Sequence, residues 1–146
     1  MTDNRSFIKD GYCVECGAKS IDDKTCIEMF HAPLTWEHND PNLYELHFWL
    51  VACYMLQHPS NMSKEGYSAL KNLFVTSYDG EWPTSYILKM NRELTRNIKI
   101  ATSISYQERE YELKQWKYTI SDIYDGGEKS AITNIKLWKE EIRREL

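Results

Sequence analysis

Three of the four cysteines lie within the first 26 residues, and their spacing is the pattern best suited to chemistry. Two residues separate Cys13 from Cys16, Gly17 follows directly, and nine residues separate Cys16 from Cys26. Cysteines two residues apart can supply adjacent corners of a tetrahedral zinc site. In such a knuckle, backbone N–H groups point at the sulfurs, and a residue with positive φ such as Gly17 closes the turn. The pattern therefore predicts a zinc knuckle with Cys13, Cys16 and Cys26 as ligands.

A closed zinc site needs a fourth ligand. The candidates are the remaining cysteine and the four histidines: His31, His38, His47, Cys53 and His58. His31 is the nearest in sequence and has a permitted spacing from Cys26. We expect His47, with His58 as a substitute for either Cys26 or His47. A ligand on the central helix would tie the N-terminal segment to the core and give metal binding a role in folding.

His47 and His58 cannot both bind one ion if a single helix carries them. They are eleven residues apart, about three helical turns, which places them on one face but about 16 Å apart along the axis. His58, just before Pro59, would also suit a structural role, because a protonated ring is stabilised at a helix C-terminus. Cys53 lies in an apolar run and is expected in the core rather than at a metal.

The cysteines also have interpretations without a metal. A CxxC redox pair normally opens a helix in a βαβ unit, which the pattern lacks. The thiols could instead be reduced and buried, and disulfides are not expected in a reducing compartment. The sequence contains no GxSxG, glycine-rich phosphate loop, HExxH or GxGxxG motif, so the common catalytic templates are missing. Metal binding is the leading hypothesis.

Composition narrows the class of protein further. The chain has 146 residues, which favours one domain. A hydrophobic fraction of 42% is too high for a disordered chain, and a net charge of −4 argues against a dedicated nucleic-acid binder. No apolar run is long enough for a transmembrane helix, and the N-terminus does not resemble a signal peptide. We expect a cytoplasmic protein.

The elements that must position these residues fall into an N-terminal arm, residues 1–41, and a helical core, residues 42–146. Gly11, Gly17, Pro33 and Pro41 mark turns in the arm, and Tyr12 suits a short β-hairpin. Residues 42–58 predict a buried helix that is apolar nearly all round, with Asp40 as N-cap and Pro59 as its end. A second helix is expected from Ser63 to the Asp79-Gly80 turn.

The C-terminal part of the chain is expected to add two more helices. Residues 81–105 contain Pro83 and could hold a short strand or a connection. Ser105 and Glu108 form a capping box for a third helix. Apolar residues recur at helical spacing along this helix: Leu113, Trp116, Ile120 and Ile123. The Asp125-Gly126-Gly127 turn then precedes a last helix with a similar apolar stripe: Ala131, Ile135, Trp138 and Ile142. The fold class is therefore mainly α, a bundle of about four to five helices with a zinc-knuckle-like arm.

The chain also resembles a bacterial family of unknown function. The likeness rests on Cys13-x-x-Cys16-Gly17, then Cys26, then Leu46-His47-x3-Val51-x2-Tyr54-x2-Gln57-His58-Pro59, and it continues weakly through Trp116 and Trp138. The resemblance implies that Cys13, Cys16, Cys26, His47 and His58 act together. It carries over no activity. The family often has a histidine on its last helices, and residues 125–136 contain none.

Together these patterns predict a small helical protein stabilised by zinc, which acts as a binding or regulatory module. Its partner would be another protein or a second copy, because tyrosine and tryptophan are enriched at interfaces. The alternative is an enzyme of the hydrolase type. In that case three protein ligands and a water would hold the zinc, and His58, Gln57 or Tyr54 would line the pocket. The number of protein ligands distinguishes the two hypotheses.

Overall fold

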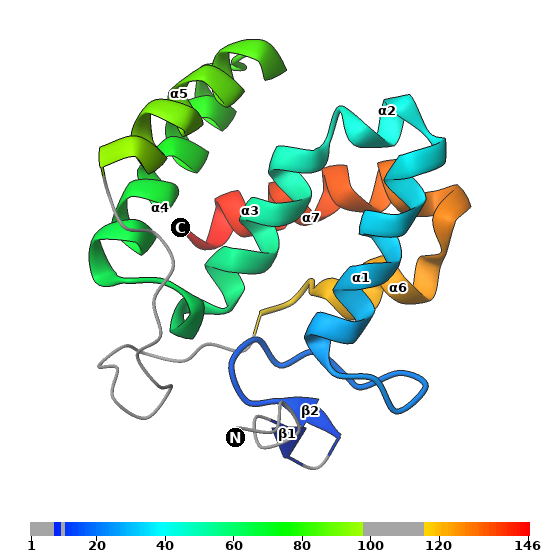
Figure 1. Cartoon of the computed structure of the whole chain (residues 1–146). Helices are drawn as coiled ribbons and strands as arrows, with labels where there is room; N and C mark the ends of the chain where they lie inside the picture. The colour runs from blue at the N-terminus through cyan, green and yellow to red at the C-terminus, as the bar shows by residue number, and fades with distance from the viewer. Residues whose placement is uncertain (1–7, 10, 98–115) are drawn as a thin grey trace.

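Seven α-helices and a small hairpin make up the described part of the computed structural model, which covers residues 8–9, 11–97 and 116–146 (Figure 1). The helices are α1 (Cys26–Trp36), α2 (Pro41–Tyr44), α3 (His47–Gln57), α4 (Lys64–Asp79), α5 (Thr84–Asn97), α6 (Ile120–Gly126) and α7 (Ala131–Glu145). The expected mainly α fold is confirmed, with more helices than the four to five predicted.

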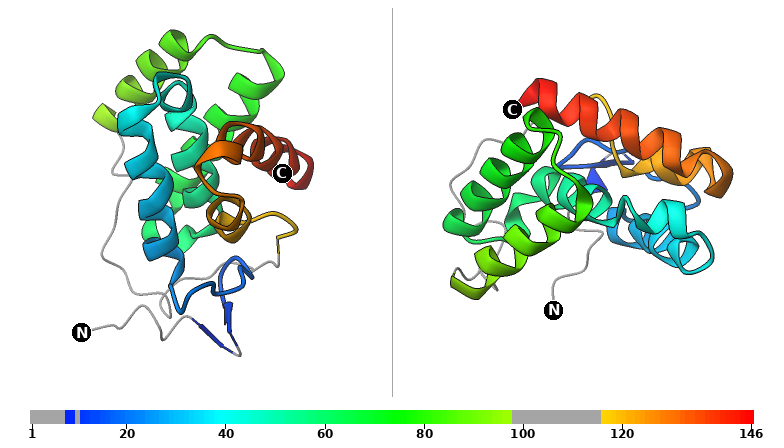
Figure 2. Two further views of the ribbon diagram at one scale, coloured as in Figure 1. Left: turned by 90° about the vertical axis from the view of Figure 1, so that its right-hand side faces the viewer. Right: turned by 90° about the horizontal axis from the view of Figure 1, so that it is seen from above.

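Helix α3 occupies the centre of the molecule. It packs on α7 and α4 and also contacts α5, while α1 and α6 pack on each other at its side (Figures 1 and 2). Leu50, Cys53 and Leu56 are at most 1% exposed, which is the burial expected of a helix that is apolar nearly all round. Cys53 is therefore a core residue, as predicted.

The single helix predicted over residues 42–58 is divided in two. Asp40 caps α2 by accepting hydrogen bonds from the N–H groups of Asn42 and Leu43, and Pro41 is the first helical residue. The chain then turns at Glu45 and Leu46 before α3 begins at His47. The predicted N-cap at Asp40 and the predicted helix start at Pro41 are confirmed. The turn at Glu45 and Leu46 separates α2 from α3.

Helices α4 and α5 form a pair on one side of α3 (Figure 1). The predicted α4 is confirmed: Ser63 caps it at the Gly66 N–H, and its buried face includes Leu70 and Phe74. Helix α5 lies in the region that sequence patterns left unassigned. Pro83 precedes this helix instead of interrupting it, which is consistent with the tolerance of helix starts for proline.

The third predicted helix differs in its start. Ser105, Glu108 and Leu113 lie outside the described residues, and Trp116 is buried but precedes the helix. Helix α6 begins at Ile120, where Thr119 and Asp122 form the capping box. The last helix, α7, buries the predicted stripe: Ala131, Ile135, Trp138 and Ile142 are all 0% exposed.

The N-terminal arm contains a helix that we did not predict. Thr25 and Glu28 form a capping box that opens α1, and Pro33, interpreted as a turn residue, lies inside this helix. Met29 and Phe30 of α1 are buried, and α1 packs along α6. Hydrophobic burial therefore outweighs the hydrogen bond that Pro33 cannot donate.

A two-stranded antiparallel hairpin precedes α1, as expected for the arm. It pairs β1 (Ile8–Lys9) with β2 (Tyr12–Cys13), with Ile8 opposite Cys13 and Lys9 opposite Tyr12. The chain then folds back so that Tyr12 bridges to Lys19. Figure 1 shows this unit below the ends of α1 and α3. Among the described residues, no helix has both the length and the apolar character that a membrane crossing requires.

Candidate metal centre

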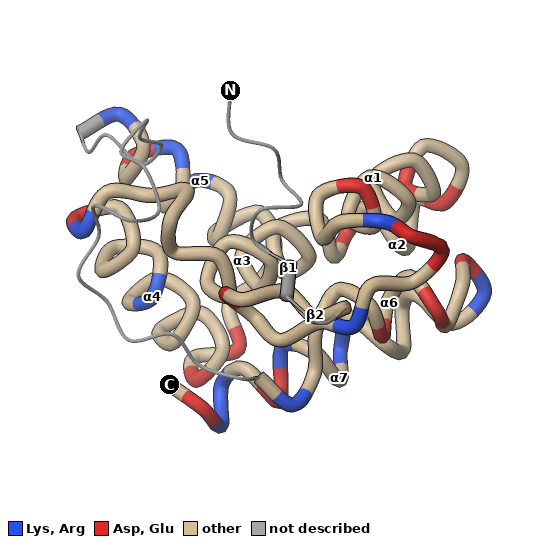
Figure 3. Tube along the Cα trace, turned by 90° about the horizontal axis from the view of Figure 1, so that it is seen from below, with Lys and Arg blue, Asp and Glu red and all other residues tan. Residues whose placement is uncertain are grey.

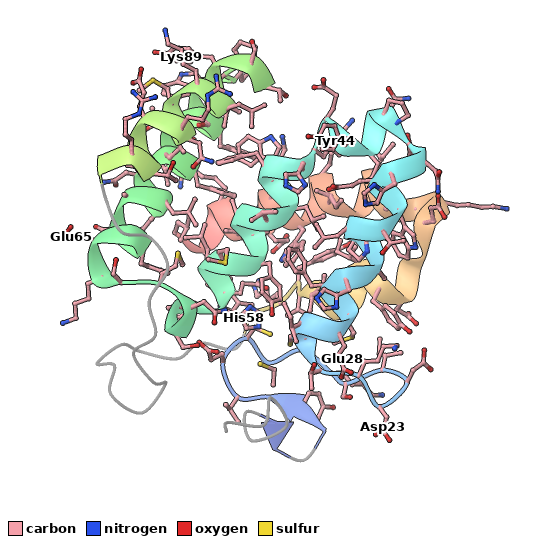
Figure 4. All side chains as sticks on the ribbon, viewed as in Figure 1. Asp23, Glu28, Tyr44, His58, Glu65 and Lys89 are labelled. Atoms are coloured by element: carbon pink, nitrogen blue, oxygen red, sulfur yellow. The ribbon has the colours of Figure 1, made fainter. Side chains whose placement is uncertain are left out.

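Four side chains from separate elements meet where the hairpin reaches the helices. Cys13 ends β2, Cys16 lies in the following turn, Cys26 is the first residue of α1, and His58 directly follows α3. Their ligand atoms all lie within 4.8 Å of one another, and all four residues are buried. Figure 4 shows His58 directed toward sulfur atoms at the end of α3. We call this group the Cys3His cluster.

The turn between Cys13 and Ala18 has the geometry of a metal knuckle. Gly17 adopts a φ of +82°, and its N–H donates to the Cys13 carbonyl over 2.9 Å. The Cys13 N–H donates to the Ala18 carbonyl over 2.8 Å, and the Ala18 N–H approaches the Cys16 sulfur at 3.4 Å. The positive φ that only glycine adopts without strain is therefore present where the CxxCG pattern predicts it.

The spacing of the ligand atoms fits a tetrahedral metal. The Cys16 and Cys26 sulfurs are 3.6 Å apart, and the Cys13 sulfur lies 3.8 Å from His58 Nε2. A zinc ion at ordinary bond lengths would hold its ligand atoms roughly 3.5–3.8 Å apart. A disulfide would require about 2.0 Å between sulfurs, and all four cysteines are free thiols. Both of these separations match the spacing that a tetrahedral zinc ion requires.

The ring of His58 is oriented for binding by its other nitrogen. Nδ1 lies 2.7 Å from the Tyr54 carbonyl oxygen, which can only accept, so Nδ1 must carry a hydrogen. Nε2 then faces the sulfurs. A hydrogen bond of this kind to a backbone carbonyl fixes the ring of most metal-binding histidines. The Tyr54 ring also stacks on His58, with centroids 4.2 Å apart.

The titration of the cluster follows from its hydrogen bonds. Those from Cys16 and Cys26 lower the pKa of Cys13, while the pKa values of Cys16 and Cys26 are raised, first by their hydrogen bonds with Cys13. Burial opposes a charge on His58, but hydrogen bonds to Cys13 and Cys26 raise its pKa to about 10. Both shifts favour the charged forms of Cys13 and His58 when no metal is bound, and a bound metal would replace the protons.

His47, which we expected as the fourth ligand, lies outside the Cys3His cluster. Its Nδ1 is 2.8 Å from a carboxylate oxygen of Glu37, and its side chain is 42% exposed. Because α3 is continuous from His47 to Gln57, the two histidines lie at opposite ends of the helix. His58, the expected substitute, is the histidine that lies beside the three cysteines. His31 and His38 are exposed and are also outside the cluster.

Sequence comparison places the chain in a family. The model of DUF5946, a family of unknown function, matches residues 11–146. The chain belongs to the DUF5946 family. The matched region contains the whole Cys3His cluster, and the predicted resemblance to a family of unknown function is confirmed. No curated protein and no solved structure matches this DUF5946 chain.

In this DUF5946 protein, one residue that the sequence patterns do not single out supports the cluster. Glu15, between the two knuckle cysteines, is only 5% exposed. Its carboxylate accepts hydrogen bonds from the Ser60 N–H at 3.0 Å and the Ser60 hydroxyl at 2.8 Å. Ser60 lies two residues after His58, so Glu15 links the cysteine knuckle to the segment that carries His58. An acidic residue inside a CxxC loop was the only available signal.

The two residues predicted to line a binding pocket are inside the protein. Tyr54 is 5% exposed and stacks between Phe30 and His58. Gln57 is fully buried, and its amide donates to the Tyr118 carbonyl over 2.7 Å. Tyr54 orients a ligand of the cluster, and Gln57 connects the end of α3 to the segment before α6.

Proposed function

We propose that the Cys3His cluster binds zinc and that the ion has a structural role. Three sulfurs and one imidazole form a donor set typical of structural zinc sites, and they are too soft for Mg²⁺ or Ca²⁺. The ligand spacings, the fixed His58 ring and the N–H directed at Cys16 all support this assignment. The single observation that carries it is the convergence of four buried ligands from four places in the chain.

The four ligands also favour a structural role over the hydrolase alternative. A catalytic zinc keeps one position for water, whereas here the Nε2 of His58 faces the site as the fourth ligand. His58 would therefore bind the metal rather than act on a substrate. The ion would hold together the knuckle, the start of α1 and the end of α3.

Cobalt substitution tests the closed site. Co²⁺ bound in place of zinc should give the intense visible absorption of a tetrahedral thiolate complex, with sulfur-to-metal charge transfer at shorter wavelength. Azide added in excess should leave this spectrum unchanged, because no position is open. A spectrum that shifts on azide addition would indicate an exchangeable position and would support the three-ligand enzyme instead.

We further propose that the zinc-stabilised bundle is a binding module for a protein surface, either a partner protein or a second copy. Large apolar side chains are exposed on three helices: Tyr44 at 62%, Tyr86 at 42%, Leu88 at 38% and Leu137 at 45%. Acidic and basic positions are interspersed along α7 (Figure 3), and the net charge is −4. Both observations favour a protein over nucleic acid. Reduced thiols suit the cytoplasm.

Sedimentation equilibrium tests the self-association part of this proposal. The apparent mass should rise between about 1 and about 100 μM if the surface binds a second copy with typical transient affinity. Replacing Tyr86 and Leu88 by serine should weaken the association, while Lys129→Ser, at an exposed polar position outside this set, serves as a control. A constant monomer mass over the whole range would eliminate self-association and leave a different protein as the partner.

A further inference from the structure

A second candidate site lies at the other end of α3 from the Cys3His cluster. A surface cavity of about 690 Å³ that is open to solvent is lined there by the first turn of α3, the C-terminal end of α4, the connection to α5 and the middle of α7. Its volume falls within the range of small-molecule sites, roughly 300–1,000 Å³. Three segments that are distant in sequence converge on it, so the tertiary fold determines its shape.

The walls of the cavity are aromatic and held in place. Trp49, Tyr78 and Trp82 line it. Trp82 packs edge-on against Tyr86, with centroids 4.6 Å apart. It also lies so close to Gly80 that a Cβ there would come within 2.7 Å of the indole nitrogen. Gly80 is therefore needed for Trp82 to take this position. Such rigid rings bind planar apolar groups by stacking.

Lys139 supplies a charge without a partner. Its ammonium lies 4.3 Å from the centroid of the Trp49 ring and 5.8 Å from that of Tyr78. In the part of the chain that the structure describes, no carboxylate forms an ion pair with Lys139. Asp79, which also lines the cavity, is bound by two hydrogen bonds from Arg143. The ring faces leave N–H donors of the ammonium available for a ligand.

We infer that this cavity binds a small planar carboxylate, with its anionic group on Lys139 beside Trp49 and its ring against Trp82. Lys139 is partly buried, and a partly buried ammonium stabilises an anion more strongly than one in open solvent. An organic cation would also suit aromatic walls, but Lys139 already places a positive charge over Trp49 and would repel it. Glu81, exposed at the rim, limits the net positive charge and favours a monoanion. The inference is independent of the metal centre.

Titration of the zinc-loaded full chain with three matched probes tests the inference. Benzoate, neutral benzamide and cationic benzylammonium share one ring, and the indole N–H signals of the five tryptophans report where each probe binds by NMR. Benzoate should bind saturably and shift the signals of Trp49 and Trp82, with little change at Trp36, Trp116 and Trp138. Benzamide should bind at least about tenfold more weakly than benzoate, because it lacks the charge-assisted hydrogen bond.

Variants then assign the charge. Lys139→Met should weaken benzoate binding by about tenfold or more, whereas Lys136→Met, an exposed lysine on the same helix outside the cavity, should leave it unchanged. Absence of saturable benzoate binding to the wild-type chain would overturn the inference. So would equal binding by Lys139→Met, or tighter binding of benzylammonium than of benzoate. The wild-type probe series remains decisive even if Lys139→Met does not fold.

Discussion

The contrast between His47 and His58 shows how one side chain acquires a role that its neighbour on the same helix lacks. Both lie in the same apolar run, and a helical wheel places them on one face. His58 follows the last turn of α3, where the Tyr54 carbonyl takes its Nδ1 hydrogen and the sulfurs face its Nε2. His47 begins the helix and pairs with Glu37. Helical periodicity assigns both histidines to the same face and cannot show which end of the helix meets the cysteines. Only the tertiary contacts show that.

Glu15 should contribute measurably to stability through Ser60. Glu15→Gln removes the charge from two partly buried hydrogen bonds, and we expect the free energy of unfolding to fall by about 1–3 kcal/mol. Ser60→Ala should cost a similar amount. In a double-mutant cycle measured by urea denaturation, the two losses should not add, with a coupling energy of about 1 kcal/mol. Additive losses would contradict a direct Glu15–Ser60 interaction.

At the scale of elements, the knuckle turn is the feature most dependent on one residue. Gly17 and Gly11 both have positive φ, at +82° and +83°, but only Gly17 lies between metal ligands. An alanine at either position should destabilise the fold by about 1 kcal/mol. Gly17→Ala should in addition lower metal affinity, because it displaces the turn that aims the Ala18 N–H at Cys16. Competition with a chromophoric chelator measures the difference, and equal affinities in both variants would contradict this role.

The ion pair between α4 and α7 should make stability depend on pH. Hydrogen bonds from Arg143 lower the pKa of Asp79, so the pair stabilises the fold at neutral pH. That contribution is lost as the pH falls below the ordinary pKa of an aspartate and through the lowered one. The difference in unfolding free energy between wild type and Asp79→Asn should be largest near neutral pH and vanish in acid. A difference that stays constant with pH would show that the charge is not involved.

At the scale of the whole molecule, the metal should stabilise one end more than the other. The Cys3His cluster joins the hairpin, the start of α1 and the end of α3, while α4 and α5 lie on the other side of α3 (Figures 1 and 2). After chelation, hydrogen exchange should speed up first in residues 11–30, with α4 and the middle of α7 still protected. Mass spectrometry of peptic fragments measures this pattern. Uniform loss of protection would indicate a single cooperative unit.

Much of the fold could be predicted where local signals and burial agree. Ser63 at the start of α4 and the stripe ending at Ile142 in α7 are such cases. Helix α1 was missed because Pro33 was interpreted as a turn, although Thr25 and Glu28 already formed a capping box. The three cysteine ligands were proposed from spacing alone. The fourth ligand and the Glu15 contact depend on how distant segments pack, and spacing carries no information about that.

If the Cys3His cluster is a structural zinc site, His58 and not His47 completes it. Elemental analysis of protein purified without added metal should find about one zinc per chain in the wild type. His58→Phe keeps a ring to stack on Tyr54 but has no nitrogen, and it should lose the zinc and unfold at lower temperature. His47→Phe, the matched control, should retain it. A well-folded wild-type protein without metal, or zinc lost from His47→Phe and kept by His58→Phe, would contradict the account.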